Sequence, residues 1–154
     1  MWLGVGYKNQ IDKINIRSVP VISATVSIVD SGRDLGVVID SRLTMSDQVT
    51  ALCRAGYYSS VSCVRWLVRS LPEECAKTLV QPFVSSRLDY CNALLYGISD
   101  SLFRRLQSIQ NAAARFLTGA SRRDHISPVL SSLHWLPVKQ RIDYKLATLV
   151  YKSL

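Results

Sequence analysis

The chain of 154 residues has the length of one domain, and its hydrophobic fraction of 48% excludes a wholly disordered protein. It carries 19 lysines and arginines against 11 acidic residues, and the whole excess of +8 falls in residues 41–154, because the first 40 residues are balanced. Arginines outnumber lysines by 13 to 6, which favours contact with phosphate groups.

The first 40 residues predict β-structure. The stretch VPVISATVSIVD, residues 19–30, alternates apolar and polar side chains as a half-buried strand does. Asp30-Ser31-Gly32 predicts a turn, and RDLGVVID, residues 33–40, predicts a second strand in which Gly36 indicates a bulge or a close backbone approach. We therefore expect one β-hairpin in an N-terminal segment, residues 1–43.

Residues 44–154 predict a bundle of about five helices, so the expected fold is mainly α. A first long helix is expected up to about Val68, because apolar residues recur every three or four positions. A second is expected from Pro72 to Gly97, kinked or split at Pro82. The remaining helices are expected over residues 100–118, 127–133 and from 138 onward.

The four cysteines predict neither a metal site nor a disulfide. Cys53, Cys63, Cys75 and Cys91 lack the close spacing of a zinc ligand pair, and no secretory signal is visible. We expect reduced thiols in the core, no cofactor, and an intracellular protein of the nucleus or cytoplasm. No apolar run is long enough to span a membrane.

The stretch Asp89-Tyr90-Cys91-Asn92 could have a catalytic role or a structural role in helix packing. Cys91 falls on the apolar stripe of the predicted helix, and no activating base stands nearby, so we expect it to be packed. Asp89 and Asn92 are three residues apart and can share a helix face. We interpret them as a polar clasp between helices with Tyr90 packed beside it, because no hydrolase, phosphate-cradling or metal-binding motif occurs.

Arginines with an aromatic residue among them predict contacts to a nucleic-acid backbone. The alternative is an ordinary solvated helix face, whereas Trp66 and Trp135 are expected to be core residues. The candidate nucleic-acid-binding residues are Arg54, Tyr58, Arg65, Arg69, Arg104, Arg105, Arg122 and Arg123.

Three stretches carry a resemblance to a known family: RDLGVVIDSRLTM, LVQPFVSSRLDYCNALLYG and LQSIQNAAARFLTGASRRDHISPVLSSLHWLPVKQRIDYKLATLVYK. In this order they resemble the region downstream of the polymerase active site in reverse transcriptases of non-LTR retrotransposons, the Jockey-like long interspersed elements. The resemblance covers about residues 31–154.

The resemblance implies that residues 33–40 form a primer grip and that residues from 44 onward form thumb and post-polymerase helices around a template–primer duplex. The family's catalytic aspartates lie upstream of the matched region, so it implies a truncated fragment that is not an enzyme on its own. Motif residues that we expect to be structural are Arg33, Asp34, Leu35, Gly36, Asp89, Tyr90, Asn92, His125, His134 and Trp135.

The expected residual function is non-specific binding of an RNA or DNA duplex. The alternative is a helical module that associates with itself or another protein through exposed apolar surface and has no nucleic-acid role. A fragment without a selected function that folds poorly is a third alternative.

Overall fold

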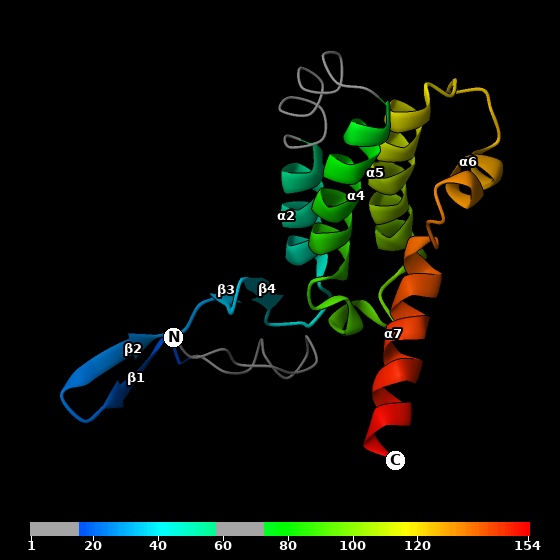
Figure 1. The fold of residues 1–154 in the computed structure, drawn as a ribbon. Helices are drawn as coiled ribbons and strands as arrows, with labels where there is room; N and C mark the ends of the chain where they lie inside the picture. The colour runs from blue at the N-terminus through cyan, green and yellow to red at the C-terminus, as the bar shows by residue number, and fades with distance from the viewer. Residues whose placement is uncertain (1–15, 58–72) are drawn as a thin grey trace. The chain divides into compact units, whose positions relative to one another are not determined.

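The computed structural model describes residues 16–57 and 73–154. The chain divides into two compact units, residues 1–51 and 52–154. Small antiparallel hairpins precede five α-helices in the described ranges, so the predicted mainly helical fold is confirmed (Figure 1). The elements are β1 (Ser18–Val21), β2 (Ala24–Ser27), β3 (Ser31–Asp34), β4 (Val37–Asp40), α2 (Ser46–Tyr57), α4 (Glu73–Asp89), the 3-10 helix η2 (Asn92–Leu95), α5 (Asp100–Thr118), α6 (Ile126–Ser132) and α7 (Val138–Ser153).

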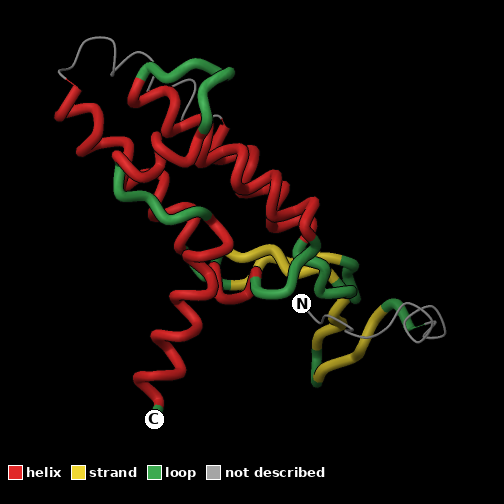
Figure 2. The backbone as a smooth tube through the Cα atoms, turned by 90° about the vertical axis from the view of Figure 1, so that its right-hand side faces the viewer, coloured by secondary structure: helices red, strands yellow, loops and turns green. Residues whose placement is uncertain are grey.

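The first unit contains two hairpins, and the prediction of a single hairpin is wrong. Strand β1 pairs with β2, and β3 pairs with β4, each antiparallel and joined by a tight turn (Figure 2). The first turn begins at Ile22 with φ 53°, a conformation that a β-branched residue rarely adopts. The sequence therefore gives no signal for a turn at this position. The second uses Leu35 at φ 44° and Gly36 at φ 84°, so Gly36 forms a turn and does not lie within a strand, where we predicted a bulge or a close backbone approach.

Asp40 organises the loop between β4 and α2. Its carboxylate accepts hydrogen bonds from the backbone N–H of Thr44 at 2.9 Å, the Thr44 hydroxyl at 2.9 Å and the backbone N–H of Met45 at 2.8 Å. Partial burial alone would raise the pKa of this carboxyl, but the hydrogen bonds from Thr44 and Met45 outweigh it and lower the pKa below its usual value. The carboxylate therefore stabilises the start of α2.

Replacing Asp40 by alanine is expected to lower the free energy of unfolding by about 1 kcal/mol at neutral pH, because two backbone donors lose their acceptor. Since the folded-state pKa is lowered, the carboxylate stabilises the fold fully above the ordinary value of 3.8. That contribution is lost as the pH falls through the folded-state pKa. Urea unfolding of the wild type and Asp40→Ala at several pH values checks this. A stability difference that does not shrink in acid would contradict it.

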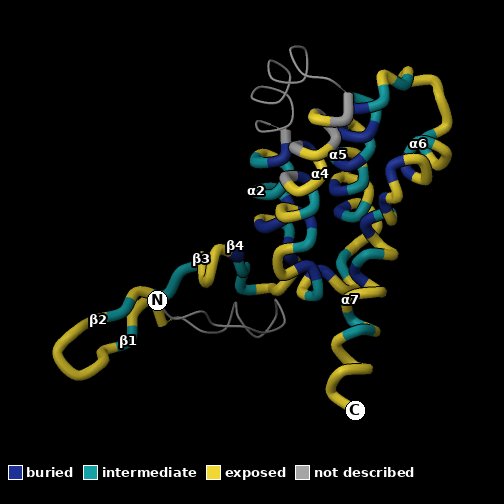
Figure 3. The backbone as a smooth tube through the Cα atoms, in the orientation of Figure 1, coloured by how far each residue is buried: buried dark blue, intermediate teal, exposed yellow. Residues whose placement is uncertain are grey.

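The second unit is built around α5. This helix packs on α4, α6 and α7, while η2 packs on α7. Its buried side includes Leu106, Ala113 and Leu117, and buried residues of α4 and α7 also contribute to the core (Figure 3). A Cβ atom built on Gly56 of α2 would lie 2.9 Å from Ile109 Cγ2, so the glycine permits a close approach of α2 to α5.

The boundaries of α5, α6 and α7 agree with the sequence patterns to within a residue, whereas α4 ends at Asp89 and not at the predicted Gly97. Helix α5 ends where predicted, before Gly119 in the left-handed conformation at φ 69°. Helix α4 is a single helix through Pro82, so the predicted split there is wrong. The proline ring lies on the exposed side of the helix, and the helix can bend there without breaking. The predicted continuation of the first helix to Val68, with Trp66, lies outside the described residues. No helix in the described ranges combines the length and hydropathy needed to cross a membrane.

Candidate nucleic-acid interface

The exposed side of α5 carries a row of polar and small residues. Arg104 and Arg105 are exposed, and Ser108, Ala112 and Arg115 follow at spacings of three or four residues. Residues at these spacings lie on the same side of an α-helix. The row therefore places positive charge near the beginning and near the end of α5.

The loop between α5 and α6 continues this row. Arg115 donates from Nε to the backbone oxygen of Ser121 at 3.2 Å and from Nη2 to the backbone oxygen of Asp124 at 3.3 Å. The Asp124 carboxylate in turn accepts from the backbone N–H of Ser121 at 2.7 Å. These bonds order the loop, from which Arg122 and Arg123 are exposed.

A groove lies where α5 meets this loop. Its volume is about 550 Å³. It is lined by Ser108, Ala112, Arg115, Phe116, Ala120 and Arg122. None of these side chains is acidic, so the groove presents two guanidinium groups, a hydroxyl group and an aromatic ring.

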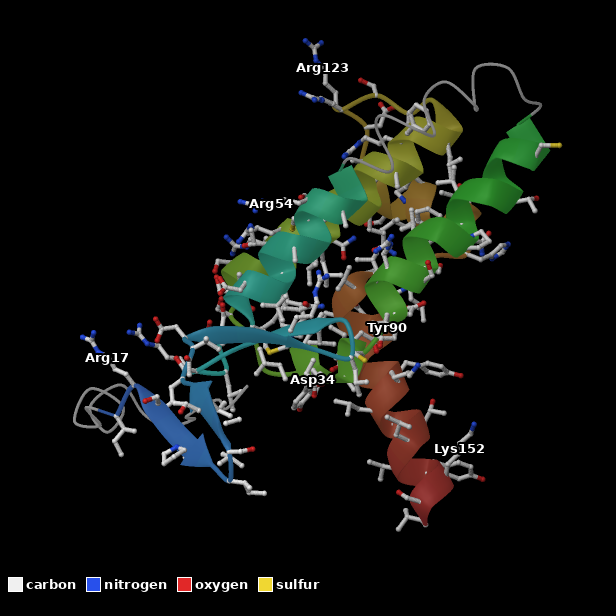
Figure 4. The ribbon with its side chains drawn as sticks, turned by 90° about the vertical axis from the view of Figure 1, so that its left-hand side faces the viewer. Arg17, Asp34, Arg54, Tyr90, Arg123 and Lys152 are labelled. Carbon is white, nitrogen blue, oxygen red and sulfur yellow. The ribbon has the colours of Figure 1, made fainter. Side chains whose placement is uncertain are left out.

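The end of α2 contributes a further arginine, Arg54, beside the row on α5. Burial raises the pKa of the Cys53 thiol, and the hydrogen-bonded guanidinium of Arg105 opposes this rise in part. This hydrogen bond places Cys53 of α2 beside Arg105 in the α5 row, and the adjacent Arg54 is exposed. In Figure 4 the side chain of Arg54 projects outward on the left of the view and that of Arg123 projects outward at the top.

We call these six arginines the α5 basic surface: Arg54, Arg104, Arg105, Arg115, Arg122 and Arg123. Five of them are predicted from the sequence, and all five are exposed. Arg115 was not predicted, although its distance of eleven residues from Arg104, about three helical turns, could have indicated it. The other three candidates, Tyr58, Arg65 and Arg69, lie outside the described residues.

A second polar cluster joins α4 to α7. Arg141 Nη1 lies 2.9 Å from Asp89 Oδ1 and 3.0 Å from Asp89 Oδ2, and its Nη2 donates to the Ser85 hydroxyl at 3.3 Å. Asn92 Nδ2 approaches Asp89 Oδ1 at 3.5 Å. Asp89 therefore does clasp two helices, but its main partner is Arg141, which the sequence pattern did not indicate.

Replacing Asp89 by alanine is expected to lower the free energy of unfolding by about 1–3 kcal/mol, because the Arg141 side chain, only 16% exposed, loses its carboxylate. The size is limited because the Asp89 side chain is itself 40% exposed. The control is Asp143→Ala, which removes an exposed acid from the same helix as Arg141. Thermal or urea unfolding followed by circular dichroism measures both, and equal stability of the two variants would contradict the clasp.

A small cavity of about 260 Å³ adjoins the clasp. It is lined by Asp89, Asn92, Leu136, Arg141, Tyr144 and Lys145. Within the described part of the chain, two buried side-chain atoms have no hydrogen-bond partner, Asn92 Oδ1 and Trp135 Nε1. Because Asn92 Oδ1 is closed off from solvent, it does not present an acceptor to a molecule in the cavity.

The prediction that Cys91 is packed is wrong. Helix α4 ends at Asp89, and Cys91 takes the left-handed conformation at φ 51°, which changes the direction of its side chain and leaves it exposed. Cys75 is also exposed and Cys53 is half-buried, so the described cysteines are not core thiols. Tyr90 is 52% exposed, not packed as predicted, and the neighbouring Cys91 raises the pKa of its phenol.

The remaining motif residues are dispersed. Arg33 and Asp34 are exposed on β3, and His134 is exposed at φ 54°. His125 precedes α6 without a side-chain capping bond. Trp135 is buried, as predicted. In residues 16–57 and 73–154 the structure brings no three His, Cys, Asp or Glu side chains together as a metal site would require.

The comparisons with known proteins give no relative. No family model matches the chain, and the searches of curated proteins and of solved structures also find no significant match.

Proposed function

We propose that residues 52–154 bind nucleic acid without sequence specificity through the α5 basic surface. The observation that carries the proposal is the continuity of this surface along one side of α5 and into the α5–α6 loop. Arginine guanidinium groups bind phosphate oxygens through paired hydrogen bonds. Contacts to phosphates carry no sequence information, which accounts for the proposed lack of specificity.

The resemblance described above supports the same proposal. If residues 44–154 correspond to the thumb and post-polymerase helices of a retrotransposon reverse transcriptase, their partner is a template–primer duplex. We infer a binding role and assign no polymerase activity, because the family's aspartate motifs are not found in this sequence.

A salt titration tests the proposed function. The affinity for a labelled template–primer duplex should fall linearly with salt on a double-logarithmic plot, with a slope of about 0.9 for each phosphate that is neutralised. The α5 basic surface offers six arginines for such contacts, so a slope of several units is expected. An affinity that is absent at low salt, or insensitive to salt, would refute the function.

The same chain is expected to give no product in a primer-extension assay with Mg²⁺, because two-metal phosphoryl transfer requires converging carboxylates. A template-dependent product that persists after contaminating polymerases have been removed by further purification would contradict this expectation.

A second candidate function is self-association through α7. The last part of this helix exposes Leu149, Val150 and Tyr151, and Leu154 follows it, fully exposed. Exposed apolar residues that gather on one helix are typical of contact surfaces. Light scattering separates the candidates, because a monomer that binds duplex supports the first and an oligomer without affinity for nucleic acid supports the second.

A further inference from the structure

The groove beside α5 combines positive charge with apolar side chains, unlike the rest of the α5 basic surface. Arg104, Arg105 and Arg123 are exposed charges, whereas the groove also contains the ring of Phe116, with the small side chains of Ala112 and Ala120 beside it. Its volume of about 550 Å³ lies within the range of roughly 300–1,000 Å³ that is usual for sites of small molecules. A group larger than a phosphate can therefore enter.

The two arginines of the groove are suited to an anion. Both hydrogen bonds of Arg115 end on backbone carbonyl oxygens, so they orient the guanidinium and leave its positive charge intact. Arg122 lies between Ser121 and Asp124 in the same loop and is exposed. The Ser108 hydroxyl donates to the backbone oxygen of Arg105 at 2.7 Å and keeps its lone pairs as acceptors.

We propose that this groove holds one unpaired nucleotide of a single-stranded nucleic acid, with its phosphate at Arg115 and Arg122 and its base against Phe116. The inference rests on the proposed function and adds that part of the bound nucleic acid is single-stranded. A positively charged groove combined with an aromatic ring is the usual arrangement for single strands, in which bases stack on aromatic side chains. A paired base in a duplex keeps its faces covered by its neighbours and cannot enter such a groove.

The test compares a single-stranded oligonucleotide with a blunt duplex of the same length, both fluorescently labelled, by anisotropy titration of the full chain. Phe116→Leu keeps an apolar side chain and removes the ring, and Phe116→Tyr restores the ring. The expected result is at least about a fivefold loss of single-strand affinity in Phe116→Leu, with duplex affinity unchanged and wild-type behaviour in Phe116→Tyr. Arg104 lies outside the groove, so Arg104→Ala should weaken the binding of the single strand and of the duplex by the same factor.

Arg122→Ala provides a second variant at an exposed position, where misfolding is not expected. It should weaken single-strand binding more than duplex binding. If the wild type binds duplex but neither Phe116→Leu nor Arg122→Ala discriminates between the two ligands, the groove is not a nucleotide site, although the proposed function stands. If the wild type binds neither ligand, both proposals fail.

Discussion

Replacing Arg104, Arg105 and Arg123 together by alanine is expected to lower the affinity for duplex DNA by roughly 500-fold near 0.1 M salt. Each arginine that contacts a phosphate contributes about 0.9 to the slope of log affinity against log salt, so three lost contacts reduce the slope by about 2.7. The affinities of the variant and the wild type should converge towards 1 M salt. All three side chains are exposed, so the loss of the Arg105–Cys53 hydrogen bond should cost little stability, and circular dichroism checks that the variant retains its fold.

The matched control removes the same amount of charge from another helix. Lys139, Lys145 and Lys152 are exposed on α7. Their joint replacement by alanine should leave the salt slope close to that of the wild type, because they lie outside the α5 basic surface. If the lysine variant loses as much affinity as the arginine variant, binding depends on net charge alone and not on this surface.

Replacing Gln110 by leucine is expected to lower the free energy of unfolding by about 2–3 kcal/mol. Gln110 is fully buried on α5; its Nε2 donates to the backbone oxygen of Leu136 at 2.9 Å, and its Oε1 accepts from Gln107 Nε2 at 2.9 Å. Gln107 Oε1 accepts from the backbone N–H of Val138 at 2.9 Å, so the two glutamines hold the start of α7 on α5. Leucine has a similar size but leaves the Leu136 carbonyl without its partner.

Urea unfolding followed by circular dichroism measures this loss. Gln140→Leu is the control, because it makes the same substitution at an exposed position of α7 and should change stability by less than about 0.5 kcal/mol. Similar stabilities of the two variants would show that the buried glutamines do not join α5 to α7.

Much of the helical part could be predicted because its signals are local. The apolar spacing of α5 and the glycine that follows it define that helix within the sequence itself. Exposed arginines on α5 and in its following loop could be predicted for the same reason. The turn at Ile22 could not be predicted, since a β-branched residue rarely adopts a positive φ and the exposed Ile22 side chain has no burial that would favour it.

The polar contacts between helices could not be predicted either. Asp89 stands out in the sequence as a candidate for a clasp, but its partner Arg141 is 52 residues away, and many arginines are equally available by sequence. Gln110 resembles an ordinary polar helix residue until the backbone of Leu136 is placed beside it. Such pairings depend on how the helices pack, which no local spacing determines.

Protection of arginines from chemical modification tests the central claim most directly. The chain is treated with phenylglyoxal in the presence and absence of a template–primer duplex, and the modified positions are found by mass spectrometry. Arg54, Arg104, Arg105, Arg122 and Arg123 should be protected by the duplex, whereas Arg17 and Arg42, exposed in the first unit, should react equally in both samples. Equal protection of all these arginines, or protection of none, would contradict a binding surface on α5.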